Sequence, residues 1–136
     1  MAEECIFCKI VKGELPCSKI YEDEDVLSFL DLFPVNKGHA LVIPKKHYEN
    51  LFDVPEELLA KVSVVMKKIA DAVKKGVNAD GISIAQNNGK SAGQVVPHIH
   101  FHVMPRFKED GLKLWPQGKY EENEMEEYMQ NIIKFL

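Results

Sequence analysis

The stretch from Pro97 to Pro105, PHIHFHVMP, constrains the fold of this chain more than any other part of the sequence. Histidines and apolar residues alternate in it, so we expect a β-strand from His98 to Met104, with one polar and one apolar face. Its histidines, His98, His100 and His102, would lie on one face about 6.5–7 Å apart. A lone histidine on a strand is usually a satisfied polar group, but three in alternation indicate a functional site.

The rest of the chain predicts an α+β fold with an antiparallel sheet. Further strands are expected at residues 18–21, 26–31, 39–43 and 81–86. Apolar residues at helical spacing predict a long helix from Pro55 to Lys75 and a second from Glu121 to Leu136. The second helix would turn five side chains inward: Met125, Tyr128, Met129, Ile132 and Ile133. Val64 lies off the apolar stripe of the first helix, which indicates another contact such as a subunit interface. Strands and helices do not alternate as βαβ units, which favours the α+β class.

Size and charge limit the kinds of function. A chain of 136 residues with 46% hydrophobic residues fits one compact domain, residues 1–136. The net charge of −4 argues against broad binding to nucleic acid. No apolar run approaches the roughly 20 residues of a membrane helix, and the beginning of the chain does not resemble a secretory signal. We therefore expect a cytoplasmic protein that binds neither nucleic acid nor membranes.

Two segments could complete a site around the histidines. The loop from Gln86 to Gln94 is rich in glycine and amide residues, and main-chain N–H groups in such a loop can hold phosphate oxygens. Alone it is an ordinary turn, and it lacks the ending of a Walker loop. His39 follows Gly38 at the beginning of a predicted strand. It is either a buried structural histidine or, if its strand lies beside the histidine strand, a partner that orients a neighbouring imidazole.

Three blocks of this sequence resemble the histidine triad (HIT) hydrolases. Within that family, the chain is most similar to bacterial or archaeal members close to the Hint branch. They are residues 93–102, GQVVPHIHFH; residues 38–45, GHALVIPK; and residues 6–10 followed by Tyr21-Glu22-Asp23. The similarity spans about residues 5–106, with residues 107–136 as a C-terminal extension carrying a helix. The resemblance implies a five-stranded antiparallel sheet with two helices. It also implies a homodimer whose sheets join into one ten-stranded sheet.

The resemblance implies a nucleotide hydrolase or transferase that acts at the α-phosphate of AMP-containing substrates. His100 would attack the phosphorus and form a nucleotidyl-histidine intermediate that water then cleaves. A neutral imidazole is a good nucleophile near neutral pH, and in the family a main-chain carbonyl holds its other nitrogen. His102 would contact the phosphate or the leaving group, and His39 would support the group. The chemistry would require no cofactor.

The same resemblance assigns nucleotide-binding residues. Asp31 would accept hydrogen bonds from the ribose, and the base would lie between Ile6, Phe7, Phe29 and Leu32. The phosphate would meet His100, His102 and the loop residues Asn87, Gly93, Gln94 and Val95. From the residues alone, core packing is the simpler explanation of Phe7, Phe29 and Leu32. Many relatives carry Ser or Thr where this chain has Val95, so a hydroxyl that could assist the leaving group is missing.

Cys5 and Cys8 have the spacing of a zinc knuckle, although a bare Cys-x-x-Cys fits a redox or an inert pair equally well. Some bacterial members of the resembled family bind structural zinc with this pair and two histidines, which correspond to His47 and His98 here. Zinc would then hold the amino-terminal segment against the catalytic one. Cys17 has no partner in this scheme and is expected to be a small buried residue.

Other functions remain open at the level of sequence. Purine nucleoside phosphoramidates are the first substrate class and dinucleoside polyphosphates the second. A metalloprotein that binds zinc through His98, His100 and His102 is physically sound, but it leaves the Gly93-Gln94 pair unexplained. The third alternative is a nucleotide-binding adaptor without turnover.

Overall fold

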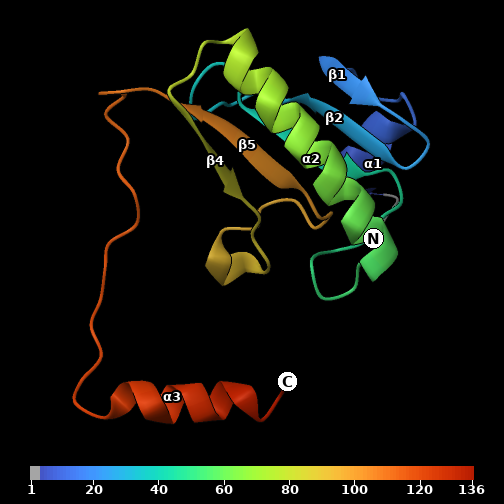
Figure 1. Cartoon of the computed structure of the whole chain (residues 1–136). Coiled ribbons are helices and arrows are strands. Elements are labelled where there is room, and N and C mark those ends of the chain that lie inside the picture. Colours follow the sequence, from blue (N-terminus) through green and yellow to red (C-terminus); the bar gives the residue numbers. More distant parts are fainter. Residues whose placement is uncertain (1–3) are drawn as a thin grey trace.

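The computed structural model describes residues 4–136, which form one five-stranded antiparallel sheet, a helix on each of its faces and a C-terminal helix apart from it (Figure 1). The strands are β1 (Lys19–Glu22), β2 (Val26–Leu30), β3 (Ala40–Pro44), β4 (Gly81–Ala85) and β5 (Phe101–Arg106). They lie in the order β1-β2-β3-β5-β4, so β1 and β4 are the edges. The helices are α1 (Ile6–Val11), α2 (Glu56–Gly76) and α3 (Glu124–Ile133). The α+β class and the five-stranded antiparallel sheet are confirmed.

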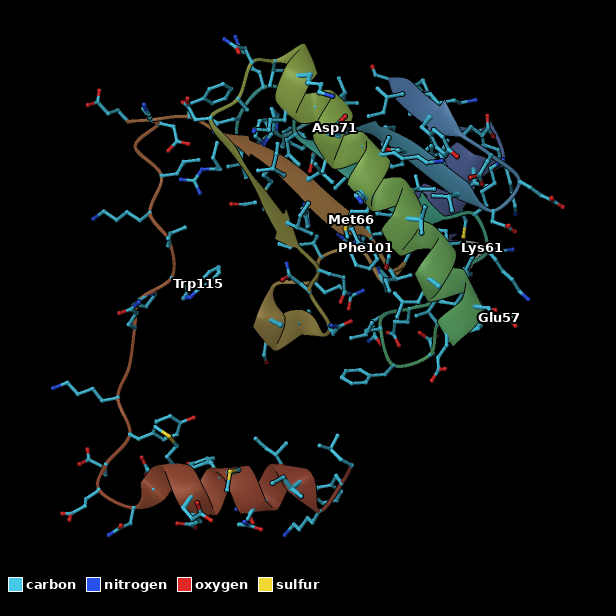
Figure 2. All side chains as sticks on the ribbon, viewed as in Figure 1. Glu57, Lys61, Met66, Asp71, Phe101 and Trp115 are labelled. Atoms are coloured by element: carbon cyan, nitrogen blue, oxygen red, sulfur yellow. The ribbon has the colours of Figure 1, made fainter. Side chains whose placement is uncertain are left out.

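Helix α2 covers one face of the sheet. Pro55 precedes it, Glu56 and Glu57 occupy its first turn and Lys74 and Lys75 its last, so its charges complement the helix dipole. Its buried stripe packs on alternate residues of the strands, as predicted from the periodicity; this core contains Val26, Val42, Val62, Val65, Ile69, Val73, Phe101 and Val103. Met66 and Phe101 lie at the contact between α2 and β5 (Figure 2).

The opposite face of the sheet carries the short helix α1. Phe7 and Cys8 of α1 pack there with a second buried set from the strands: Leu27, Phe29, Leu41 and Ile43. Leu41 of β3 is opposite His102 of β5 in the antiparallel register, so His102 faces the α1 side. The histidines and α2 are therefore on different faces of the sheet.

The last strand is shorter than the alternation predicts, and this is a correction. We expected it to begin at His98, but β5 begins at Phe101, and only His102 of the three histidines lies within it. The ladder between β3 and β5 ends at the pair Val42–Phe101. Beyond that point the carbonyl of Pro44 accepts a hydrogen bond from the side chain of His98 at 2.8 Å, instead of from a neighbouring main chain.

Helix α1 was not expected. It has six residues, and the Cys5 side chain caps it by accepting a hydrogen bond from the N–H of Cys8 at 3.3 Å. A helix this short gives no clear periodicity and is not stable alone, so tertiary contacts must hold it.

The C-terminal helix differs from the prediction in its surroundings. Helix α3 forms, but Met125, Tyr128, Met129, Ile132 and Ile133 are exposed rather than turned inward. Figure 1 shows α3 apart from the sheet and joined to β5 by an extended segment, on which the exposed Trp115 lies (Figure 2). Within residues 4–136, no helix is both long and apolar enough to span a bilayer.

Candidate functional site

Three imidazoles form a contiguous group at the junction of β3 and β5. His102 lies in β5, His100 just before it, and His39 immediately before β3. The ring centroids of His100 and His102 are 5.0 Å apart, and those of His39 and His102 are 5.1 Å apart. We call His39, His100 and His102 the histidine group. The structure brings together all three residues that the sequence analysis named as catalytic.

Hydrogen bonds fix the tautomers of His39 and His102. The main-chain N–H of Val35 donates to Nδ1 of His39 at 3.0 Å, so the proton of this neutral ring is on Nε2. That Nε2–H lies 2.9 Å from Nδ1 of His102, to which it donates. The remaining proton of neutral His102 is then on its Nε2. His102 is therefore a hydrogen-bond donor at that atom.

His100 has the opposite arrangement. Its Nδ1 lies 2.8 Å from the carbonyl oxygen of His98, which can only accept, so the proton is on Nδ1 and Nε2 carries a free lone pair. The ring is 7% exposed, and the edge of Phe7 packs against it with ring centroids 5.1 Å apart. A buried imidazole with one nitrogen held and the other free is in the form that a nucleophile needs.

Burial keeps these rings neutral at physiological pH. Desolvation, together with the neighbouring His100 and His39, lowers the pKa of His102 to about 4. Burial also lowers the pKa of His39, against the opposing charge of Asp31, whose Oδ2 is 3.6 Å from Nε2 of His39. The pKa of His100 is lowered by burial too, although its bond to the His98 carbonyl acts in the opposite direction.

The loop after β4 is held in shape by its own amide side chains. The N–H of Gly89 donates to Oε1 of Gln94 at 2.8 Å, and Nε2 of Gln94 donates to the carbonyls of Glu49 and Val96. Gly89 and Gly93 have φ values of 89° and 93°, a region that favours glycine. Gln94 thus shapes the loop with its side chain. Asn87 lies beside Gly93, at whose position an added Cβ would be 3.7 Å from Nδ2 of Asn87.

The residues expected around the base and ribose differ in exposure: some are buried and others are open to solvent. Phe7 and Phe29 are buried and pack edge to face with centroids 5.6 Å apart. Ile6 and Leu32 are exposed by 52% and 86%. Asp31 is half-buried, and its Oδ1 accepts the N–H of Phe33 at 2.9 Å. Val95 is 88% exposed.

A second cluster lies beside the histidine group, formed by Cys5, Cys8, His47 and His98, which we call the Cys/His cluster. One donor atom from each of the four lies within 4.8 Å of the others. Nδ1 of His98 is 3.3 Å from Sγ of Cys5 and 3.5 Å from Sγ of Cys8, while Nδ1 of His47 is 3.3 Å from Sγ of Cys8. Sulfur and nitrogen ligands of tetrahedral zinc are separated by about 3.6 Å, given bond lengths of about 2.3 and 2.0–2.1 Å.

The tautomer of His98 also suits a metal. Its Nε2 lies 2.8 Å from the carbonyl of Pro44 and must carry the proton, so the lone pair is on Nδ1, which faces the two sulfurs. The donor types, their separations and their burial all fit zinc. These four residues are the ones that the resemblance assigned to a metal.

Asp31, His39 and His102 also have donor atoms within 4.8 Å of one another. In their hydrogen-bonded state they do not suit a metal, because the Val35 N–H occupies Nδ1 of His39 and leaves Nε2 protonated. The described residues do not gather His98, His100 and His102 around one point, because Nδ1 of His98 faces the cysteines and Nδ1 of His100 faces a carbonyl. The alternative of a zinc site built from these three histidines is therefore not supported.

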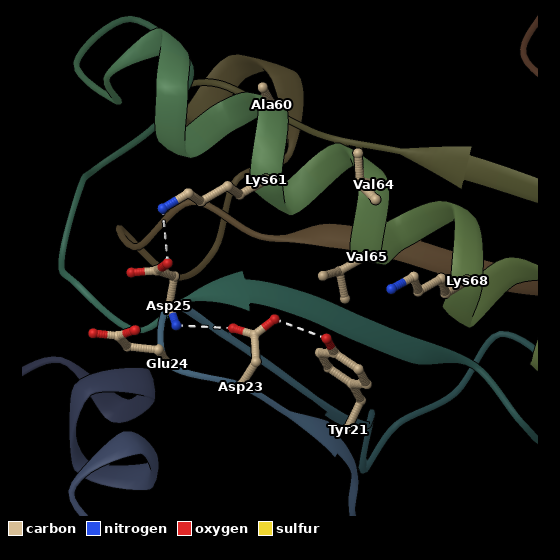
Figure 3. Close-up of a pocket in the computed structure, with 9 residues that line it drawn as sticks. All are labelled: Tyr21, Asp23, Glu24, Asp25, Ala60, Lys61, Val64, Val65 and Lys68. Carbon is tan, nitrogen blue, oxygen red and sulfur yellow. Dashed lines mark hydrogen bonds and ion pairs between the residues drawn. The ribbon is translucent and has the colours of Figure 1, made fainter.

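A hollow of about 420 Å³ lies on the other side of the sheet, between α2 and the β1–β2 turn (Figure 3). Acidic residues line its turn side, and Lys61 pairs there with Asp25 at 3.0 Å. Asp23 accepts the hydroxyl of Tyr21 at 2.7 Å. It contains no histidine, and its acidic turn would repel phosphate, so it is not a candidate for the nucleotide site.

Three contributions escaped the sequence analysis because they come from main-chain atoms or a distant element. The N–H of Val35 and the carbonyl of Pro44 orient His39 and His98. Asp110 accepts hydrogen bonds from Asn36 and from Arg106, and so ties the end of β5 to the loop that precedes His39. Of these contributions, only those of Asn36, Arg106 and Asp110 come from polar side chains, which are visible in a sequence.

Comparisons with known proteins agree with this geometry. The sequence model of the HIT domain matches residues 12–109. Adenosine 5'-monophosphoramidase hnt1 of Schizosaccharomyces pombe is 44% identical over 114 residues, which cover 82% of this chain and 83% of that protein. The crystal structure of a HIT family member from Bacillus subtilis superposes with a TM-score of 0.91 at 40% identity, covering 98% of this chain and 97% of that one. A zinc-bound histidine triad family protein from Mycobacterium smegmatis superposes with a TM-score of 0.79 at 40% identity over the whole of both chains.

Proposed function

Since this chain belongs to the HIT domain family, we propose that it hydrolyses AMP-containing substrates, or transfers their nucleotide, at the α-phosphorus. One observation carries the proposal: His100 is neutral, its Nδ1–H is held by the His98 carbonyl, and its Nε2 is free beside a second imidazole that carries a proton. The pair supplies a nucleophile and a hydrogen-bond donor without a cofactor.

The reaction has two balanced steps. Nε2 of His100 attacks the α-phosphorus, a phosphorus–nitrogen bond forms, and the bond to the leaving group breaks while the Nε2–H of His102 donates a hydrogen bond to that group, which takes its proton from water. Water then attacks the nucleotidyl-histidine, the phosphorus–nitrogen bond breaks and the proton of that water goes to solvent, so that AMP leaves and His100 regains its free Nε2. His39 keeps His102 in the required tautomer through the 2.9 Å hydrogen bond. Positioning and hydrogen-bond donors supply most of the transition-state stabilisation.

The nucleotide would lie on the α1 side of the sheet. Asp31 accepts the ribose hydroxyls, and the exposed side chains of Ile6 and Leu32 cover the base, with Phe7 and Phe29 beneath them as packing. Main-chain N–H groups near Gly93 and Val95, with the amide of Asn87, meet the phosphate. Gln94 contributes by holding this loop in shape.

Purine nucleoside phosphoramidates are the first substrate class. Similarity to a protein named adenosine 5'-monophosphoramidase supports this choice. The Nε2–H of His102 also suits it, because a hydrogen bond to the departing nitrogen stabilises the charge that develops on the leaving amine. Dinucleoside polyphosphates are the alternative, and an adaptor would bind nucleotides without turnover.

The Cys/His cluster would hold a structural zinc ion, in agreement with its donor set and with the zinc-bound relative. When bound, zinc supplies a fixed tetrahedral link between α1, the segment after β3 and the segment before β5.

A homodimer is proposed for the assembly. Strand β4 is an edge of the sheet, and its unpaired main chain could join the same strand of a second copy. The exposed apolar face of α3, together with Val64 on α2, which is 59% exposed, would be covered by that copy.

The test is the release of AMP from adenosine 5'-phosphoramidate and from diadenosine polyphosphates, with His100→Ala as the control variant. We expect release from the phosphoramidate and a loss of at least about 1000-fold in kcat for His100→Ala. A trapped nucleotidyl-protein absent from His100→Ala would support the intermediate. If the protein binds nucleotides but releases AMP from neither substrate class, the proposed enzymatic function is wrong and the nucleotide-binding adaptor is favoured.

A further inference from the structure

His98 connects the Cys/His cluster to the proposed nucleophile. Its Nδ1 faces the sulfurs of Cys5 and Cys8, its Nε2 donates to the carbonyl of Pro44, and its own carbonyl accepts the Nδ1–H of His100 at 2.8 Å. The side chain is fully buried. The atom that fixes the tautomer of His100 therefore belongs to a residue whose ring is a metal-ligand candidate.

The main chain at His98 lies outside the sheet, so a few contacts determine its position. Residues 97–100 precede β5 and lie outside the sheet ladder, which begins at Phe101. The N–H of His98 donates to the nearby carbonyl of Val96, and the N–H of Ile99 to the carbonyl of Tyr48. The His98 carbonyl shares its peptide unit with the N–H of Ile99. Its position therefore depends on the buried ring of His98, on the buried side chain of Ile99 and on the main chain at Tyr48, which follows His47 of the cluster.

Helix α1 adds a second connection. Phe7 lies between the two cysteines in sequence, and its ring packs edge to face on both His98 and His100, with centroids 5.9 and 5.1 Å apart. A six-residue helix is not stable alone. Anchoring Cys5 and Cys8 would therefore also fix the ring that packs against the nucleophile.

We propose that the Cys/His cluster, when it holds zinc, positions the nucleophile: it fixes the His98 carbonyl, and through that carbonyl the tautomer and direction of the His100 ring. Cys5, Cys8, His47 and His98 are then positioning residues for the reaction at His100. The inference rests on the proposed function and assigns to the metal site a role beyond stability. A displacement of about 1 Å at a reacting group can cost roughly 100-fold in rate, so a loosened carbonyl would lower kcat while nucleotide binding stays intact.

The experiment compares zinc-loaded, chelator-treated and zinc-reloaded full-length protein. The first readout is the ring signal of His100 in nitrogen–proton NMR spectra, assigned with His100→Asn, which reports whether Nδ1 holds its proton in a hydrogen bond. The second is kcat and KM for adenosine 5'-phosphoramidate. We expect metal removal to shift or broaden the Nδ1 signal and lower kcat by about 10- to 100-fold, with KM changed less than about twofold and zinc reversing both effects.

Variants separate positioning from general stability. His47 is the least buried of the four residues, so His47→Ala removes one ligand with little repacking. His47→Cys restores four ligands and should recover kcat and the His100 signal. Cys17→Ser is the matched control, because Cys17 is a free cysteine outside the cluster, and it should behave as the parent protein.

The outcomes distinguish failure of the positioning role from failure of the proposed function. A folded metal-free protein with the parent kcat and an unchanged His100 signal would overturn the inference, as would purified protein that takes up no zinc. If metal-free protein unfolds, His47→Ala provides the same comparison, and a parent-like kcat there also overturns it. Zinc-loaded protein that releases no AMP would refute the proposed function instead, while the NMR signal still tests the link from zinc to His100.

Discussion

At the scale of single residues, the site is a set of neutral imidazoles with assigned protons. His39, His98 and His100 each have one ring nitrogen bonded to a main-chain atom, and His102 takes its tautomer from His39. Free Nε2 on His100 and Nε2–H on His102 follow from these partners. The proposed division into nucleophile and hydrogen-bond donor thus results from hydrogen bonding, since both side chains are of the same type.

Val95 offers a test of leaving-group preference. It is 88% exposed, so Val95→Ser should change the free energy of unfolding by less than about 0.5 kcal/mol. A hydroxyl there could donate to the leaving group, and one hydrogen bond of about 0.5–1.5 kcal/mol corresponds to a roughly 2- to 10-fold rise in kcat. The measurement is kcat for phosphoramidates with amines of different basicity. Val95→Ala is the control, and equal rates for the two variants would contradict the prediction.

The lowered pKa of His102 predicts how stability depends on pH. Burial lowers that pKa from 6.5 to about 4 in the folded protein, so between these values the unfolded chain binds more protons. Stability from this group is present above about pH 6.5 and is lost as the pH falls toward 4.

The check is urea unfolding of the parent protein and of His102→Asn between pH 7.5 and 4.5 at the same zinc loading. On acidification the free energy of unfolding should fall more steeply for the parent protein than for His102→Asn. The difference in slope is at most about 1.4 kcal/mol per pH unit, which corresponds to one proton. Parallel curves for the two proteins would show that His102 does not titrate in this way.

The sequence predicted which side chains gather at the proposed site, but it did not predict the tautomers of His39, His98 and His102. His39, His100 and His102 are brought together, and so are Cys5, Cys8, His47 and His98. The tautomers depend on the N–H of Val35 and the carbonyl of Pro44, and every residue type has such a carbonyl. Their positions follow from the path of the chain, which no local motif specifies.

At the scale of elements, the structure differs from the prediction where tertiary contacts replace local pattern. The alternation of residues 98–104 indicates one strand, but β5 begins at Phe101 because the His98 side chain bonds the Pro44 carbonyl. Helix α1 is too short for its periodicity to be recognised, and its cap is a cysteine side chain rather than a typical capping residue. Helix α2, with 21 residues, was predicted within one or two residues.

The turn before β3 depends on Gly38. Its φ is 103°, and an added Cβ would lie 2.8 Å from Cγ1 of Val77. Gly38→Ala should therefore cost about 1–3 kcal/mol of unfolding free energy, as strained backbone positions typically do. It should also lower kcat, because the turn places His39.

Gly76→Ala is the matched control. An added Cβ there meets nothing within 4 Å, and the residue ends α2, so the change should be neutral or stabilising by up to about 1 kcal/mol. Urea unfolding measures both variants. Equal effects at the two positions would mean that neither the φ angle nor the Val77 contact matters.

At the scale of the whole molecule, the extended segment after β5 and helix α3 lie apart from the core that the sheet forms with α1 and α2 (Figure 1). The apolar periodicity of residues 121–136 correctly predicts a helix with one apolar face. Periodicity reports that a face must be covered, but not which chain covers it. The structure leaves Met125, Met129 and Ile132 exposed, in agreement with the proposed second copy.

Replacing an apolar residue of α3 tests this assembly. Ile132→Asp places a charge on the apolar face and should raise the dimer dissociation constant at least about 10-fold, equivalent to 1.4 kcal/mol. Asn131→Asp adds the same charge away from that face and should leave the dimer intact. Light scattering coupled to size-exclusion chromatography gives the masses. A parent protein that is monomeric at micromolar concentration would contradict the proposed dimer.

The main-chain partners of the imidazoles have an evolutionary consequence. A backbone carbonyl cannot be removed by a codon change, and a backbone N–H is removed only by a change to proline. Apart from Val35→Pro, random mutagenesis of Val35 or Pro44 can therefore disturb ring orientation only by changing the path of the chain. Libraries that diversify side chains around the phosphate loop should therefore retain an active nucleophile in most members. New leaving groups are then accessible to selection without first rebuilding the reactive centre.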